Sequence, residues 1–128
     1  IAHTLAVSTN APSGYAITVR GQTLTSQQNG ANTIDATGGT AVSSSAGTEQ
    51  FGIRASASGG TGSTIDATFS GGSTYGYDAT ATTSVSFASG SGATNTTTYS
   101  LHYLANIAGT TEAGTYAASL VYVATANF

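Results

Sequence analysis

Two histidines and seven charged side chains are the groups through which this chain could perform acid–base or metal chemistry. A Ser–His–acid triad can be drawn from His102, Glu112 and any of many hydroxyls, but the excess of serine and threonine selects none of them. Neither a Gly-x-Ser-x-Gly nor a His-Glu-x-x-His motif is present, and carboxylates paired at short spacing are missing. We therefore expect a protein that is not an enzyme, without catalytic residues, metal site or cofactor, in which His3 and His102 are ordinary strand residues.

A short acidic motif occurs twice in the chain. Residues 33–37 and 64–68 both read Thr-Ile-Asp-Ala-Thr, and each copy is followed by a Gly-Gly pair. Calcium loops place several acidic or amide oxygens within about a dozen residues, which neither copy does. We interpret the repeat as turn chemistry in a chain of few residue types, with a calcium or repeat motif as the alternative.

The composition excludes several classes of protein. A net charge of -3, without any lysine, leaves nothing to neutralise a run of phosphates, so no nucleic-acid partner is expected. No apolar run approaches the roughly 18 to 20 residues that cross a bilayer, so no membrane span is expected. The absence of cysteine excludes disulfides and thiolate zinc sites. The two arginines, Arg20 and Arg54, are expected to pair with acids or solvent, although a lone guanidinium could also specify a subunit contact.

Apolar and polar residues alternate with a period of two, which is typical of β-strands. Residues 1–8 and 15–20 are predicted to form a hairpin around a turn at residues 10–14. Near the C-terminus, a strand around residues 99–104 precedes a last long strand over residues 115–128. Strands separated by turn signals, without helical pattern, predict an all-β protein. We expect one domain over residues 1–128, an antiparallel β-sandwich, immunoglobulin-like or jelly-roll-like, with strand-like termini.

The C-terminal third carries a resemblance to a known group of proteins. Residues 99–107, 109–116 and 120–128, with their Ala-Gly-Thr-Tyr and Tyr-x-Ala-Thr-x-x-Phe patterns, resemble the closing hairpin of largely uncharacterised secreted surface proteins of candidate-phyla (Patescibacteria-type) bacteria. Residues 8–15 and 51–53 are similar to that family as well. More loosely, the last strand resembles that of WxL-type cell-wall proteins, with Tyr122 and Ala124 in place of Trp and Leu. The resemblance implies a secreted or cell-surface β-sandwich and supplies no activity.

Both ends of the chain are strand-like, and this feature leads to the first functional prediction. Either end could add to an open sheet edge, and neither carries the lysine, proline or inward charge that commonly blocks such pairing. Because a head-to-tail edge contact does not close, it produces a filament. The sequence thus predicts a structural subunit of an extracellular filament or surface layer, a homopolymer that assembles by β-strand addition or donor-strand exchange.

The N-terminal strand is the predicted donor. Its apolar face, which would fill a groove in the next subunit, consists of Ile1, His3, Leu5 and Val7. The alternative is that this strand pairs with residues 15–19 of its own domain.

A carbohydrate-binding or adhesive module of a bacterial cell-surface protein is the second functional prediction. Five of the seven tyrosines are expected on core faces, namely Tyr15, Tyr99, Tyr103, Tyr116 and Tyr122. Tyr75 and Tyr77, placed in a Gly-rich loop, are the candidates for ligand contact, and the uncharged hydroxyl-rich surface suits a neutral glycan. Ice binding through a Thr array is a weaker third possibility.

Overall fold

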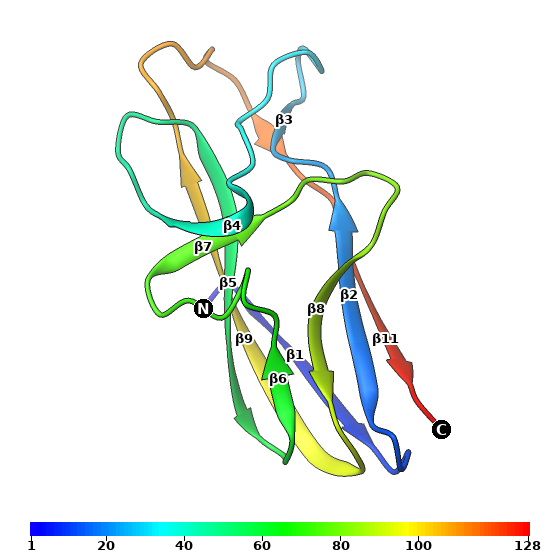
Figure 1. Cartoon of the computed structure of the whole chain (residues 1–128). Helices are drawn as coiled ribbons and strands as arrows, with labels where there is room; N and C mark the ends of the chain where they lie inside the picture. Colours follow the sequence, from blue (N-terminus) through cyan, green and yellow to red (C-terminus); the bar gives the residue numbers. More distant parts are fainter.

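The structure is a computed structural model that describes residues 1–128, and it consists of β-strands, turns and loops. Eleven strands form two large sheets and one small two-stranded sheet (Figure 1). Every pair of neighbouring strands is antiparallel. The prediction of an all-β protein built as an antiparallel sandwich is confirmed. No helix of the length and apolar character needed to span a lipid bilayer is found.

The larger sheet has five strands and holds the N-terminal strand at one edge. In spatial order its strands are β1 (His3–Thr9), β9 (Thr94–Asn106), β5 (Gln50–Gly59), β7 (Thr74–Tyr77) and β4 (Gly38–Ser43). The long β5–β9 ladder forms its centre and runs from Gln50 opposite Asn106 to Gly59 opposite Thr97.

The second sheet has four strands and holds the C-terminal strand at one edge. In spatial order its strands are β11 (Leu120–Ala126), β2 (Tyr15–Gly21), β8 (Val85–Gly90) and β6 (Ser63–Ile65). A small third sheet pairs β10 (Tyr116–Ala117) with β3 (Thr25–Ser26). In Figure 1 this small sheet lies at the upper end of the molecule, whereas β1 and β11 both run toward the lower end.

The core lies between the two large sheets and is rich in aromatic rings. Alternate residues of β2, starting with Tyr15, are buried, and so are Tyr99 and Leu101 of β9. The hydroxyl groups of Tyr15 and Tyr99 are hydrogen-bonded at 2.7 Å, which joins one sheet to the other. This pairing is favourable, because a buried hydroxyl left without a partner costs about 1–3 kcal/mol. The core positions predicted for these two tyrosines are therefore confirmed.

The predicted N-terminal hairpin is wrong. β1 pairs with β9, from His3 opposite Leu101 to Thr9 opposite Thr94, whereas β2 pairs with β11 and β8 in the other sheet. The connection between β1 and β2 crosses from one layer to the other, and Ala11 within it is completely buried. The same types of turn residue occur in a turn that joins two neighbouring strands of one sheet and in a connection that crosses between two sheets. These residues therefore do not identify the strand with which β1 pairs.

The predicted closing hairpin is also wrong. β9 and β11 lie in opposite sheets, and the last strand is interrupted at residues 118–119, where β10 ends and β11 has not yet begun. β10 pairs with β3, and β11 pairs with β2 from Leu120 opposite Gly21 to Ala126 opposite Tyr15. The apolar faces of β9 and β11 thus meet across the core instead of lying side by side in one sheet.

Gly90 makes room for the ring of Tyr15. A Cβ at position 90 would lie 2.2 Å from Cε1 of that ring. Since overpacking a filled core costs about 1–3 kcal/mol, we expect Gly90→Ala to lower the free energy of unfolding by that amount. Urea unfolding measures the loss. Gly39→Ala on β4, where a Cβ would meet no atom within 4 Å, is the control, and equal losses in the two variants would contradict this account.

Candidate functional site

The predicted donor residues lie on or next to an edge strand of the sandwich. Leu5 and Val7 are half-buried and pack against the core, whereas Ile1 precedes β1 and is 75 % exposed. His3 is exposed, and its ring stacks on Tyr103 at 5.6 Å between centroids and meets the edge of Tyr122 at 6.1 Å. β1 therefore has partners within its own chain, but its side chains are less enclosed than those of the inner strands.

Two sheet edges on one side of the sandwich carry no protective side chain. β1 borders the five-stranded sheet and β11 borders the four-stranded sheet. Neither strand contains a charged residue or a proline, which are the usual means of blocking edge-to-edge pairing. On the outer face of β11, Val121 is 42 % exposed and Val123 is 45 % exposed. Both edges can therefore accept a further strand by main-chain hydrogen bonding.

An aromatic groove of about 370 Å³ opens between the starts of these two edge strands. It is lined mainly by apolar residues from both sheets, namely His3, Leu24, Phe51, Tyr103, Ala118, Leu120 and Tyr122. The hydroxyl groups of Tyr103 and Tyr122, two of the lining residues, are hydrogen-bonded at 3.0 Å. Burial raises the pKa of Tyr103 and, more strongly, that of Tyr122, so both hydroxyls stay protonated and the tyrosine lining stays neutral at physiological pH.

Sequence reasoning missed this groove because its lining comes from five separate stretches of chain. The sequence predicts core faces for Tyr103 and Tyr122, and this prediction is confirmed, since both pack against the core while remaining partly exposed. Their meeting across the sandwich depends on β9 and β11 lying in opposite sheets, a placement that the alternation of residues does not encode.

The two tyrosines predicted to contact a ligand have different surroundings. Both lie in strand β7 and not in a Gly-rich loop. Tyr77 is completely buried, with the edge of its ring against Phe51 at 5.5 Å between centroids, so its assignment as a ligand contact is wrong. Tyr75 is partly exposed, but the guanidinium of Arg54 covers its ring at 5.3 Å from the centroid. A free stacking platform for a neutral sugar is therefore not formed by this pair.

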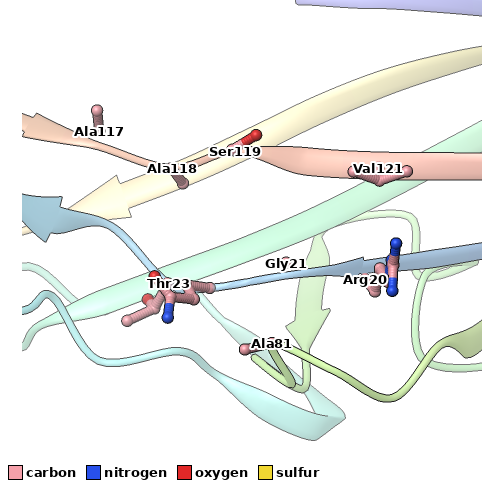
Figure 2. A pocket seen from close by; sticks show the side chains of 9 residues that line it. Arg20, Gly21, Thr23, Ala81, Ala117, Ala118, Ser119 and Val121 are labelled. Carbon is pink, nitrogen blue, oxygen red and sulfur yellow. The ribbon is translucent and has the colours of Figure 1, made fainter.

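A second groove, of about 380 Å³, lies where β2 ends beside the β10–β11 connection. Figure 2 shows Ala117, Ala118, Ser119 and Val121 on one side of it and Arg20, Gly21 and Thr23 on the other, with Ala81 beneath. Arg20 is its one charged lining residue. The side chain of this arginine is exposed, as expected for a guanidinium that faces solvent.

The groups considered for catalysis and metal binding are dispersed. His102 lies on the outer face of β9 opposite Arg54, whereas the Glu112 carboxylate accepts a hydrogen bond from Asn32. Asp66 of the second repeated motif accepts a hydrogen bond from the Thr68 amide at 3.0 Å, which is turn chemistry as interpreted from the sequence. The structure contains no group of three or more His, Cys, Asp or Glu side chains that could hold a metal ion.

Comparison with family models, with curated proteins and with solved structures gives no significant match for this chain.

Proposed function

We propose that the chain is a structural subunit of an extracellular filament or surface layer and that it assembles by exchange of strand β1 between copies. The position of β1 is the observation that carries this proposal. The strand borders its sheet, pairs with β9 alone, and contributes only half-buried side chains to the core. Since full burial of an aliphatic side chain is worth about 1.5–3 kcal/mol, releasing β1, whose apolar side chains are at most half-buried, costs less than releasing an inner strand.

The connection after β1 provides a hinge next to a fixed anchor. The register of the β1–β9 ladder shifts between Val7 and Thr9, which marks an irregularity at the end of the strand. Directly beyond it, Ala11 is buried, and the Ser13 amide donates to the Asn127 carbonyl at 3.1 Å. β1 can thus swing out from a point that stays attached to its own subunit.

Exchange of β1 in one direction would build an open polymer. When β1 of one copy pairs with β9 of the next, it repeats the contacts that it makes within its own chain, so the exchange loses little free energy. Each receiving copy has its own β1 left to donate, and the contact does not close on itself. A surface with few charges and many hydroxyls suits dense packing of such copies outside the cell, without any enzymatic turnover.

Deletion of residues 1–8 tests the proposal directly. We expect the truncated chain to fold but not to elongate, because it can accept a strand and cannot give one. Electron microscopy of the full and truncated chains measures elongation. A synthetic peptide of residues 1–9 should bind the truncated chain, and binding should be detected by fluorescence anisotropy.

The peptide with Leu5 and Val7 both replaced by serine is the matched control, since it keeps the backbone and loses the core contacts. Fibres formed by the truncated chain would exclude β1 as the donor. Single particles of subunit size from the full chain would reject polymerisation. They would favour the second candidate function, a ligand-binding module of a surface protein. The observation that supports this second candidate is the set of residues around Arg54.

A further inference from the structure

The outer face of the five-stranded sheet holds a small cavity of about 170 Å³ around Arg54. Arg54 of β5 lies directly opposite His102 of β9 in the ladder. The cavity, here called the Arg54 cavity, is lined by Arg54, Ala55, Ser56, Ser70, Gly71, Gly72 and His102. It thus combines two nitrogen-bearing side chains with two hydroxyls and contains no acidic group.

The guanidinium of Arg54 is held in one position by its neighbours. It lies over the ring of Tyr75 at 5.3 Å, a cation–π contact, and its Nη1 donates to the Gly72 carbonyl. Arginine side chains normally lose considerable rotamer freedom when they bind a ligand. Because Arg54 is already fixed, ligand binding would cost little side-chain conformational entropy.

One donor of this guanidinium has no partner. The Nε atom of Arg54 is buried and makes no hydrogen bond within the chain. An unpaired buried donor is unfavourable by about 1–3 kcal/mol, and more when it carries charge. The partners of this guanidinium are a carbonyl and an aromatic ring, and no carboxylate lines the cavity, so its positive charge favours an anionic acceptor.

The neighbouring histidine is affected by desolvation and, to a smaller extent, by positive charge. Desolvation lowers the pKa of His102, and the positive charges of the Ile1 amino group and of Arg54 lower it further. Desolvation disfavours charge of either sign, so only the contribution of the two positive charges indicates a place where a negative charge is favoured. A carboxylate matches this place well, because its two oxygens can accept hydrogen bonds from a guanidinium in the same plane.

We propose that the Arg54 cavity binds the carboxylate of an acidic sugar, of the hexuronate type. The carboxylate pairs with Arg54 and His102. The hydroxyls of Ser56 and Ser70 form hydrogen bonds with the ring hydroxyls of the sugar, as donors or as acceptors. The cavity is smaller than the roughly 300–1,000 Å³ of drug-sized pockets, which fits a single sugar unit and not an extended chain. This site is independent of strand exchange, since it lies on the outer face of the sheet.

Titration of the full chain with galacturonate, galactose and acetate tests the proposal. Amide chemical shifts in the nuclear magnetic resonance spectrum report binding at the cavity. We expect galacturonate to shift signals of β5, β9 and residues 70–72 at millimolar concentration, while galactose, which has the same ring without the carboxylate, leaves them unchanged. Acetate should bind more weakly than galacturonate, because it lacks the ring hydroxyls.

Arg54→Gln should weaken galacturonate binding by about tenfold or more, the loss expected for a charge-assisted hydrogen bond. His102→Gln is a second variant that should also weaken binding, and thermal unfolding verifies that both variants fold. Arg20→Gln, which removes the other arginine from the opposite sheet, is the matched control and should leave binding unchanged. Equal binding of galactose and galacturonate, equal binding of acetate, or no effect of Arg54→Gln would each overturn the proposal.

Discussion

Between pH 10 and pH 12 the folded protein should lose most of its stability, because two fully buried tyrosines cannot ionise in place. Burial, followed by the nearby Tyr103 and Asp78, raises the pKa of Tyr77 from its ordinary 10.0 to about 12. Burial, followed by the hydrogen bond with Tyr15, also raises the pKa of Tyr99 strongly. In the unfolded chain both phenols ionise near pH 10, as exposed tyrosines do.

The direction of the effect follows from proton binding. Below pH 10 both states hold these protons, so the stability is fully present. Above that pH the unfolded chain releases them first, and stability falls until the folded pKa is passed. Each group contributes about 1.4 kcal/mol per pH unit, so the two together cost about 5 kcal/mol over two units, comparable with the entire stability of a small domain. Burial also raises the pKa of Tyr103 and of Tyr122, so these two groups add to the loss in the same direction.

Urea unfolding at a series of alkaline pH values measures this loss, and tyrosinate absorbance shows which state has ionised. Tyr77→Phe is an informative variant, since the Tyr77 hydroxyl is buried without a hydrogen-bond partner. Removing that hydroxyl should leave the free energy of unfolding at pH 7 unchanged or raised. It should also make the free energy of unfolding fall less steeply with alkaline pH, by the contribution of one tyrosine. Ionisation of all seven tyrosines near pH 10 in the folded protein would contradict the account.

A disulfide that fastens β1 to its own β9 should abolish elongation. The chain contains no cysteine, so a pair introduced at Ala6 and Thr98 has no competing thiol. These residues are opposite one another in the ladder and lie on the outer face, where cysteines leave the core intact. We expect oxidised Ala6→Cys/Thr98→Cys monomers to remain monomeric and to form fibres after reduction. Fibre length by electron microscopy measures the effect.

The same pair of cysteines reports where β1 lies in a finished fibre. Oxidation of fibres assembled from reduced protein should produce covalent oligomers on a non-reducing gel, because each β1 then lies against β9 of another copy. Ser56→Cys/Ser100→Cys, which joins β5 to β9 within the stable centre of the sheet, is the control and should not affect elongation. Elongation of locked monomers would reject exchange and would point to simple addition at the free edges.

The sequence allowed the buried faces of strands to be predicted better than their neighbours. Alternation places Tyr15 and Tyr99 on core faces, and the structure agrees, because both sheets of a sandwich bury one face. Alternation carries no information about which sheet a strand joins, and for this reason both predicted hairpins failed. The proximity of Arg54 to His102 was likewise beyond prediction, since it depends on the register of the β5–β9 ladder.

Tyr77 illustrates a different source of error, the meaning of glycine. The glycines near Tyr77 favoured a loop in the sequence. In the structure, Gly76 lies within a strand, and its missing side chain makes room for the backbone of Thr68, whose carbonyl oxygen would lie 2.5 Å from a Cβ. Glycine here permits close packing of a strand and not a turn. In a chain with 17 glycines, a glycine in a turn and a glycine in a closely packed strand have similar local sequences. They differ in whether another part of the chain packs against the glycine.

The pairing of β1 with β9 also sets an order of events during biosynthesis. Of the strands in this sheet, β1 is synthesised first and β9 last. In the ladder between them, His3 is opposite Leu101 and Val7 is opposite Thr97. Contacts between residues so distant along the chain form late, because closing a long loop is entropically costly. A newly made chain therefore carries an unmatched first strand while its remaining strands emerge. Under the proposed strand exchange, copies released close together at high local concentration would have their best opportunity to interlink at that moment.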